Sequence, residues 1–345
     1  MSDEKLVQEL RNVSALAPRL LADVGGTNAR FALEVRPHCF EAVSVLACNA
    51  YPDIYSAICA YLENAAVRAV LALHPGVIEH AAIAIANPVD GDLVTMTNHH
   101  WTFSVESLRH ALELKTLLVV NDFTALAMAL PHLSGAQRQQ IGEGVTQANR
   151  VIGLIGPGTG LGVSGIIPAG AHWVPLSSEG GHVTFAPASL AELELMEKIW
   201  VDYPHISAER LISGMGLELI YQTLMRSARD VGEDQLPAAE ITRRALSGDC
   251  GVCIDTVSHF CAMLGTVAGN LALTLGATGG IYIGGGIVPR LGQLFAESAF
   301  RQRFEAKGRF ADYLANIPTY VITAQYPAFL GVSVILSEKL AAAHP

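Results

Sequence analysis

Short apolar runs rich in β-forming residues alternate with longer amphipathic runs, and this alternation constrains the fold more than any other feature. The strand-like runs are "RAVLAL" (68–73), "HAAIAIA" (80–86), "TLLVV" (116–120), "VIGLIG" (151–156), "GGIYIGGG" (279–286) and "TYVITA" (319–324). The helix-like runs are "DIYSAICAYLENAA" (53–66), "SVESLRHAL" (104–112), "LAELELMEKIW" (190–200) and "ITRRALSG" (241–248). Such alternation predicts a mixed or parallel sheet covered by helices.

Length and charge narrow the class of protein further. A chain of 345 residues exceeds the usual size of a single core, so two domains or one elaborate α/β domain are expected. The formal net charge of -10 provides no basic surface that would hold nucleic acid or an anionic membrane. We therefore expect small-molecule partners, no nucleic acid and no membrane. The most polar connector, residues 135–150, is where we expect a domain seam.

The six cysteines favour a reducing compartment. They lack the spacing of a disulfide framework, and the first residues, "MSDEKLVQELRNVS", have no apolar core of a signal peptide. Both features predict a cytoplasmic protein. The one CxxC pair, Cys250 and Cys253, has no second pair, so two residues one turn apart on a helix are favoured over zinc ligands.

One long apolar stretch raises the question of a membrane span. Residues 256–289 contain no Asp, Glu, Lys or Arg, and their length would admit a spanning helix. Eight glycines nevertheless fall between Gly265 and Gly286, and "IYI" follows Gly279 and Gly280. This pattern favours the end of a buried helix followed by a buried strand.

Two glycine-rich turns share one design. "LLADVGGTNARFAL" (20–33) and "IGLIGPGTGLGVSGI" (152–166) each join two apolar strands through glycine and threonine, which hints at an internal duplication. Glycine permits positive φ and removes Cβ, so that backbone N–H groups can converge on an anion. Two phosphate cradles could thus hold one polyphosphate, and ordinary hairpin turns are the alternative. No GxxxxGK[ST] motif occurs, and "GLGVSG" precedes a strand-like rather than a helical segment, so neither a P-loop nor a dinucleotide site is expected.

A carboxylate follows the strand "TLLVV". Asn121 and Asp122 end this strand, and a helix-like run starts around Thr124. Ligands of α/β sheets bind outside the carboxyl ends of strands, which favours a chemical role for Asp122. The alternative is that Asp122 only caps the helix.

Further polar residues suit a polyhydroxylated ligand, because each hydroxyl stripped of water needs a partner. They are Asn98 in "MTNHHW", Glu179 and His182 in "SSEGGHVTF", and Glu209 in "HISAERLIS" at a probable helix start. Taken singly, each has a purely structural explanation. Asn98 would be a turn residue, Glu179 a solvated loop charge, His182 a histidine with its hydrogen bonds satisfied, and Glu209 a carboxylate in the first turn of a helix.

Several motifs along the sequence resemble those of a known family. The motifs "DVGGTNARFAL", "MTNHHW", "NDFTA", "GPGTGLG", "EGGHVTFAP", "HISAERLISGMGL", "GNLALTLGATGGIYIGGGIVPR" and "FEAKGRF" are similar to those of the bacterial glucokinases. The resemblance runs in order from about residue 20 to the C-terminus. The chain lacks the zinc-type cysteine cluster of the related ROK sugar kinases, which favours the non-ROK branch.

The resemblance implies a fold. It is an α/β, two-domain actin-like ATPase (ribonuclease H-like) fold with the active site in the interdomain cleft. Residues 17–121 plus 328–345 would form the small domain, residues 122–327 the large domain, and residues 1–16 an N-terminal extension. The last helix-like run, "LGVSVILSEKLAA", would return to the small domain.

The resemblance also implies an activity and a site. The activity is that of an ATP:hexose 6-phosphotransferase, a glucokinase that phosphorylates D-glucose at the C6 hydroxyl in the first step of glycolysis, in a cytoplasmic homodimer with ATP and Mg²⁺. Asp122 would be the catalytic base, and Asp23 would hold the hydrated Mg²⁺ through a water. The sugar contacts would be Asn98, Asp122, Glu179, His182 and Glu209. The nucleotide contacts would be Ala22, Asp23, Val24, Gly25, Gly26, Thr27, Gly158, Thr159 and Gly160 at the phosphates, and Gly214 and Gly285 at the nucleoside.

Two other functions stay open at the level of sequence. One is a kinase for another hexose or an amino sugar, and the other is a non-catalytic sugar-sensing regulator. A sensor of that kind would normally carry a DNA-binding helix-turn-helix, for which the N-terminal segment is too short. The phosphate donor is also open.

Overall fold

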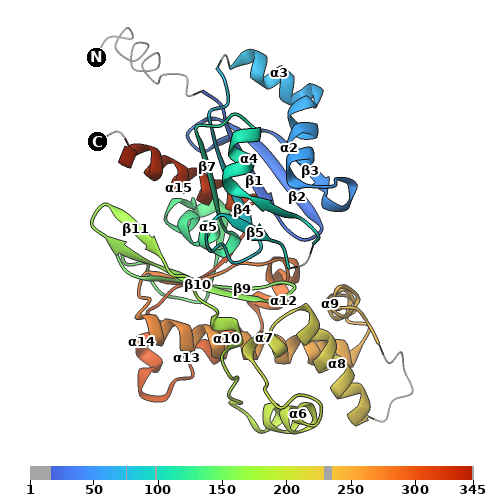
Figure 1. Ribbon diagram of the computed structural model, residues 1–345. Helices are drawn as coiled ribbons and strands as arrows, with labels where there is room; N and C mark the ends of the chain where they lie inside the picture. The colour runs from blue at the N-terminus through green and yellow to red at the C-terminus, as the bar shows by residue number, and fades with distance from the viewer. Residues whose placement is uncertain (1–16, 75, 98, 229–234, 344–345) are drawn as a thin grey trace. The chain divides into compact units, whose positions relative to one another are not determined.

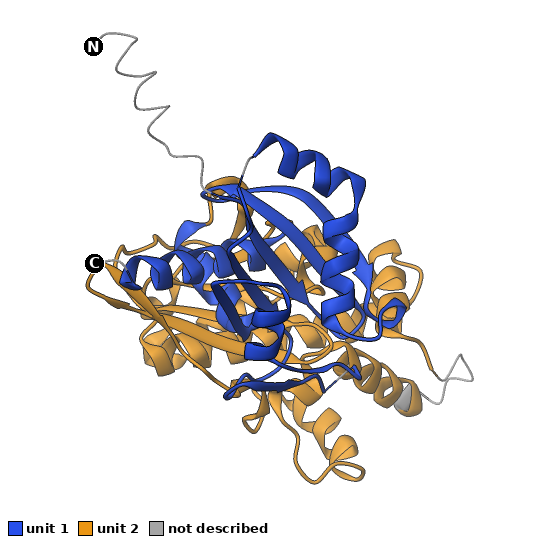
Figure 2. Cartoon of the chain, turned by 45° about the horizontal axis from the view of Figure 1, so that its top comes forward, with its two compact units in different colours: residues 1–132, 326–345 blue, residues 133–325 orange. Residues whose placement is uncertain are grey.

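The computed structural model describes residues 17–74, 76–97, 99–228 and 235–343, and its contacts divide the chain into two compact units (Figure 2). Unit 1 runs to His132 and resumes at Tyr326, and unit 2 is Leu133–Gln325. The division falls just before the polar connector. It leaves residues 122–132 with unit 1, whereas the predicted domain boundary followed residue 121. The assignment of functional domains stays a prediction.

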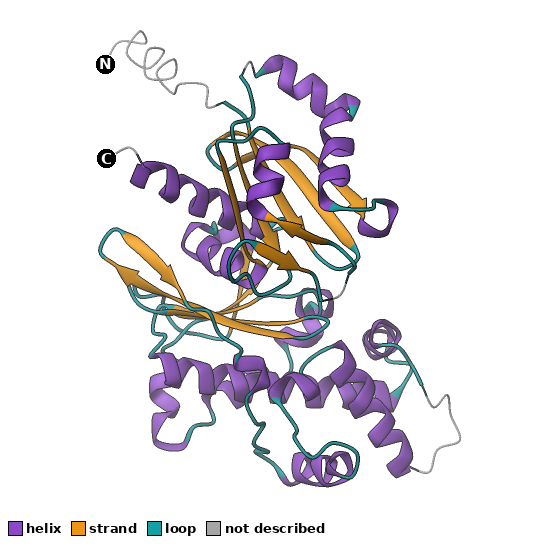
Figure 3. Cartoon of the chain, viewed as in Figure 1, coloured by secondary structure: helices purple, strands orange, loops and turns teal. Residues whose placement is uncertain are grey.

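Unit 1 is a five-stranded sheet with helices on both faces (Figures 1 and 3). Its elements are β1 (Arg19–Val24), β2 (Asn28–Arg36), β3 (Cys39–Ala47), η1 (Cys48–Ala50), α2 (Ile54–Glu63), α3 (Ala65–Leu73), β4 (His80–Ile85), β5 (Leu93–Thr95), β6 (Thr102–Ser104), α4 (Val105–Ala111), β7 (Thr116–Asn121), α5 (Asp122–Ala129), η2 (Leu130–His132) and α15 (Pro327–Ala343). The strand order is β3-β2-β1-β4-β7, and β5 and β6 form a separate hairpin. The first three strands are antiparallel, whereas β1, β4 and β7 run parallel.

The two faces of this sheet bury different helices. Leu20 and Ala22 pack into a cluster with α2 and α3, whereas Leu21 packs with Ala125 of α5 and with α15. Side chains alternate along a strand, so Asp23 lies on the same face as Leu21, beside the start of α5. The C-terminal helix α15 therefore belongs to unit 1, as the last helix-like run was expected to.

Unit 2 is a six-stranded sheet with a helical layer (Figure 3). Its elements are η3 (Gly135–Gln137), β8 (Arg138–Ile141), β9 (Ile152–Pro157), β10 (Leu161–Ala169), β11 (His172–Pro175), η4 (Gly180–His182), α6 (Leu190–Trp200), α7 (Ala208–Leu211), α8 (Gly214–Ala228), α9 (Ala238–Ser247), α10 (Gly251–Leu275), β12 (Gly280–Ile283), α11 (Val288–Leu291), α12 (Gln293–Ala296), α13 (Phe300–Glu305), η5 (Gly308–Phe310), α14 (Ala311–Ala315) and β13 (Thr319–Ile322).

The second sheet repeats the plan of the first. Its order is β11-β10-β9-β12-β13-β8, with β9, β10 and β11 antiparallel and β9, β12 and β13 parallel. The first five strands match β3-β2-β1-β4-β7 in order and direction, and β8 is an addition at the edge. The two glycine turns fall at equivalent places in both units, between β1 and β2 and between β9 and β10. The expected duplication is thus present in the topology.

The long apolar stretch forms helix α10 followed by strand β12, as expected. Among the described residues, α10 is the one single helix long and apolar enough to cross a membrane, and 61% of its most apolar window is buried. Helices α2 and α3 would pass the same test only as one span, but they bend by 66°. Phe260, Leu264 and Ala268 of α10 pack in the core of unit 2, so α10 is a core helix of that unit.

One predicted strand is wrong. "RAVLAL" (68–73) lies in helix α3, whereas the other five strand-like runs contain β4, β7, β9, β12 and β13. The side chain of Asn64 accepts a hydrogen bond from the backbone N–H of Ala66 and so starts α3 directly after α2. Alanine and leucine are strong helix formers, and this cap decides the ambiguity of a short apolar run. Three helix-like runs contain α2, α4 and α6, and the fourth, 241–248, covers most of α9 (Ala238–Ser247).

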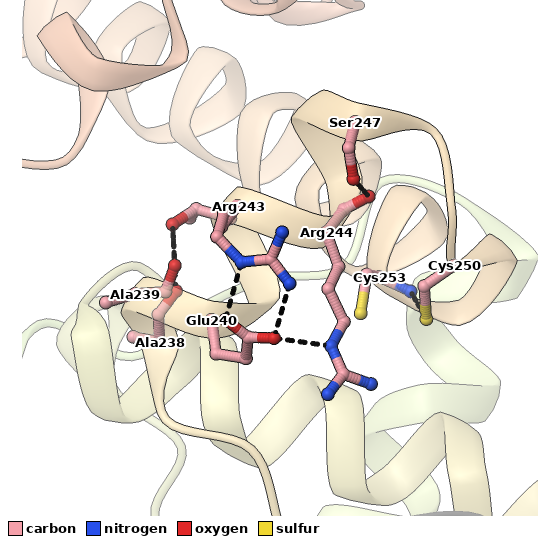
Figure 4. A network of polar contacts seen from close by, with 9 residues as sticks. Ala238, Ala239, Glu240, Arg243, Arg244, Ser247, Cys250 and Cys253 are labelled. Carbon is pink, nitrogen blue, oxygen red and sulfur yellow. Dashed lines mark hydrogen bonds and ion pairs between the residues drawn. The ribbon is translucent and has the colours of Figure 1, made fainter.

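The cysteines are free, as their spacing predicts. Cys250 caps α10, and its Sγ accepts a hydrogen bond from the backbone N–H of Cys253 (Figure 4). Nearby on α9, Glu240 pairs with Arg243 and Arg244. Within the described ranges, no three His, Cys, Asp or Glu side chains form a group that could hold a metal ion.

Candidate active site

The first glycine turn, residues 25–27, joins β1 to β2. The N–H of Gly25 donates to the carbonyl oxygen of Asn28 at 3.0 Å. The turn is also tied to η1, because the N–H of Cys48 donates to the carbonyl oxygen of Thr27 at 2.9 Å and Cys48 Sγ donates to that of Gly25 at 3.3 Å. Thr27 is exposed at its tip. The turn is therefore held from behind, and its outer side stays accessible.

Asp23 is the last residue but one of β1, beside this turn. Its Oδ2 accepts a hydrogen bond from Arg30 on β2 at 2.9 Å. Burial raises the pKa of Asp23, and the charge of Arg30 and its hydrogen bond oppose that rise. Asp23 is a half-buried carboxylate with one basic partner at the end of a strand.

Asp122 is the first residue of α5, although the helix was expected to start near Thr124. The cap is Asn121, whose Oδ1 accepts hydrogen bonds from the backbone N–H groups of Phe123 and Thr124 at 2.9 and 3.2 Å. The capping explanation of Asp122 is therefore wrong, although its Oδ1 does accept from the Phe123 N–H at 2.9 Å. Burial, with a smaller contribution from the negative charge of Asp23, raises the pKa of Asp122 to about 6.

Asn121 and Asn87 are site residues that sequence reasoning missed. Asn121 Nδ2 donates to Asp122 Oδ1 at 3.1 Å and to the carbonyl oxygen of Asn87 at 3.2 Å. The side chain of Asn87 in turn accepts from the N–H of Thr97 at 2.8 Å. Asn121 is the last residue of β7, and Asn87 lies two residues after the end of the neighbouring parallel strand β4; these positions at the carboxyl ends of two strand-like runs could have identified both. Asn98, which follows Thr97 in the sequence and is a predicted sugar contact, lies outside the described residues.

The second glycine turn, residues 158–160, joins β9 to β10 in unit 2. The N–H of Gly158 donates to the carbonyl oxygen of Gly160, and the N–H of Gly214 donates to that of Gly158, both at 2.8 Å. Gly214 begins α8, so the predicted phosphate turn and one predicted nucleoside residue lie in contact. Thr159 is exposed at the tip of the turn.

Gly285 closes the other side of this turn. It adopts φ +75°, and a Cβ there would lie 2.2 Å from the carbonyl oxygen of Pro157. Glycine permits positive φ, but Gly25, Gly158 and Gly160 in the two glycine turns do not adopt it. At Gly160 the absent Cβ is what matters, because a Cβ would lie 2.4 Å from Glu209 Oε2.

The structure brings together Glu179, His182 and Glu209, which we call the carboxylate–histidine cluster. His182 lies 3.9 Å from both carboxylates, with Nε2 toward Glu179 and Nδ1 toward Glu209. Glu209 lies in the first turn of α7, as expected, with Ser207 as the cap. An isolated bridge between Thr184 and Ser207 holds the two segments together. The cluster offers oxygen and nitrogen atoms beside the second glycine turn.

A family model described as Glucokinase matches residues 20–339. This chain belongs to the glucokinase family. The chain is 50% identical to the glucokinase of Chromobacterium violaceum over 326 residues. These residues cover 94% of this chain and 90% of that protein. The glucokinase from an Antarctic psychrotroph has a similar solved structure, with a TM-score of 0.83, 33% identity, and coverage of 94% of this chain and 99% of that one. The expected two-domain fold of the glucokinases is confirmed.

Some relatives in the glucokinase family are much longer. The bifunctional protein glk of Burkholderia pseudomallei is 58% identical over 323 residues, which cover 94% of this chain and 49% of that protein. The chain thus spans about half the length of these curated relatives.

Proposed function

We propose that this chain transfers a phosphoryl group from ATP to the C6 hydroxyl of D-glucose. Membership of the glucokinase family supports this activity. The structural observation that carries it is Asp122, a half-buried carboxyl group at the carboxyl end of a parallel strand, with its pKa raised to about 6. A raised pKa in such a place is typical of a general base that works near neutral pH.

In this proposal Asp122 orients the sugar hydroxyl and accepts its proton as the phosphoryl group is transferred. A sugar hydroxyl is a poor nucleophile, and a carboxylate within about 3 Å makes its oxygen available for attack. Asn121 holds Asp122 Oδ1 in place through its side-chain N–H. The carboxylate–histidine cluster and Asn98 would bind the other sugar hydroxyls.

The two glycine turns would bind the phosphates of ATP through backbone N–H groups, which favour developing negative charge. Residues 22–27 serve in unit 1 and residues 158–160 in unit 2, with Gly214 and Gly285 beside the nucleoside. A valine at Gly26 would fill the first turn with a branched side chain, so Gly26→Val should weaken ATP binding.

The residues present fit a magnesium ion. Mg²⁺ prefers carboxylate oxygens together with waters and substrate phosphates. Asp23 and Asp122 are both partly buried carboxyl groups with raised pKa values. The charge of Asp23 contributes to the raised pKa of Asp122. A cation would favour the ionised form of both. When bound, Mg²⁺ neutralises charge on the phosphate oxygens. We also propose a cytoplasmic homodimer, as in the family resemblance.

The decisive experiment is initial-rate phosphorylation by the purified protein with ATP and Mg²⁺ across glucose, mannose, fructose and N-acetylglucosamine. We expect clear preference for glucose, and Asp122→Asn should lower turnover by about 10² or more with a smaller change in glucose affinity. Preference for another sugar would reassign the substrate. Binding of glucose without any phosphorylation would make the protein a sugar sensor.

A further inference from the structure

The carboxylate of Glu209 contacts two elements that the proposed function gives to different substrates. Its Oε2 accepts a hydrogen bond from the backbone N–H of Leu161 at 2.8 Å, directly after the second glycine turn. Its Oε1 lies 3.9 Å from Nδ1 of His182 in the carboxylate–histidine cluster. The Glu209 side chain is 25% exposed, against 77% for Glu179. Its protein neighbours, more than solvent, therefore fix its position.

The packing around this carboxylate leaves little free space. A Cβ on Gly160 would lie 2.4 Å from Glu209 Oε2, and a Cβ on Gly181 would lie 2.1 Å from the carbonyl oxygen of Leu161. The glycine turn, Glu209 and the η4 segment are thus in direct contact on both sides of Leu161. Close-packed elements transmit displacements, so a shift of the carboxylate must move the turn, or lose its hydrogen bond to it.

We propose that Glu209 is a positioning residue that couples sugar binding to the geometry of the second glycine turn. The inference rests on the proposed function, in which the carboxylate–histidine cluster binds the sugar. A sugar hydroxyl bound at Oε1 fixes the carboxylate, and Oε2 then holds the Leu161 N–H and with it the backbone of the turn. Nucleotide binding is thereby favoured once sugar is bound. Coupling is reciprocal, so a change in the turn must also change the affinity for sugar.

Two glycines of the turn provide a matched test. In Gly160→Ala, the new methyl group displaces the Glu209 carboxylate from Leu161, while Glu209 and the other predicted sugar contacts keep their own side chains. In Gly158→Ala, the Cβ meets nothing within 4 Å. Glucose affinity is measured by titration calorimetry without nucleotide. We expect Gly160→Ala to weaken glucose binding about tenfold or more, as for loss of a hydrogen bond to a charged group. Gly158→Ala should bind glucose within about twofold of the wild type.

A second measurement covers the case in which Gly160→Ala fails to fold. Saturating glucose should tighten binding of the ATP analogue AMPPNP to the wild type and to Glu194→Gln, which changes an exposed carboxylate of α6 outside the predicted sites. In Glu209→Asp the shorter side chain cannot contact both partners, so this tightening should disappear.

The outcomes separate the two proposals. A wild type that binds and phosphorylates glucose, while Gly160→Ala and Gly158→Ala bind glucose equally well, overturns the coupling alone. So does Glu209→Asp with the same tightening of AMPPNP binding as the wild type. A wild type that binds no hexose overturns the proposed function and the coupling together.

Discussion

Ionisation of Asp122 is required for its proposed role as a base, but it opposes the stability of the folded chain. The pKa of Asp122 is about 6 in the folded chain against the ordinary value of 3.8, mainly through burial. Between these two values the folded state binds more protons than the unfolded state, so the contribution of Asp122 to stability falls as pH rises from about 4 to 6. Above pH 6 the protein holds a half-buried charge that a base requires.

Replacing this charge should therefore stabilise the protein at alkaline pH. We expect Asp122→Asn to raise the melting temperature by about 2–6 °C at pH 8 and to leave it unchanged at pH 4.5, because 1 kcal/mol corresponds to about 2–4 °C in a chain of this size. The control is Asp90→Asn, an exposed loop carboxylate, which should change neither value. Equal melting temperatures of Asp122→Asn and wild type at pH 8 would contradict the buried-charge account.

Asn121 is expected to act on both the helix and the base. Its Oδ1 caps α5, and its Nδ2 hydrogen bond lowers the pKa of Asp122. Asn121→Ala should cost about 1 kcal/mol of stability through the lost cap. It should also move the acidic limb of the kcat/KM profile to higher pH, since Asp122 loses a donor. Asn64→Ala, which removes the cap of α3, should lower stability without moving that limb. An unchanged profile in Asn121→Ala would remove Asn121 from the site.

At the scale of elements, the packing of α15 on α5 depends on one glycine. A Cβ on Gly331 would lie 1.7 Å from the carbonyl oxygen of Ala125, a backbone atom that cannot rotate away. We expect Gly331→Ala to destabilise the protein by about 3 kcal/mol or more, the upper range for overpacking. Gly251→Ala is the control, because this helical glycine has nothing within 4 Å, and it should be neutral or stabilising. Urea unfolding measures both, and equal midpoints would refute the packing argument.

The elements also show which parts of the fold can be predicted from sequence patterns. β4, β7, β9, β12 and β13 could be predicted because buried parallel strands are short apolar runs bounded by polar or glycine residues. "RAVLAL" has the same composition, and only the Asn64 cap makes it a helix. The glycine turns could be located, but not the reason for Gly160, since the sequence does not show that Glu209 approaches it. Asn121 was missed as a cap because Asp122 beside it is an equally good capping residue.

At the scale of the whole molecule, the two sheets share an order of five strands. One glycine turn follows β1 in unit 1, and the other follows the equivalent strand β9 in unit 2. The groups assigned to catalysis are nonetheless divided between the two units. Asp23 and Asp122 belong to unit 1, whereas the carboxylate–histidine cluster belongs to unit 2. In the proposed function, duplication thus provides the two similar anion-binding turns, and the residues that differ between the copies provide the base and the sugar contacts.

The proposed function, with its groups divided between the two units, predicts that glucose draws the units together. The base must come within about 3 Å of the sugar hydroxyl, and a closed site also keeps water from accepting the phosphoryl group. We therefore expect saturating glucose to lower the radius of gyration measured by small-angle X-ray scattering. Sorbitol at the same concentration, which lacks the pyranose ring, should leave it unchanged, as should glucose added to Glu209→Ala at a concentration that leaves this variant unbound. A scattering profile of the wild type that glucose does not alter would mean that the units need no closure to assemble the site.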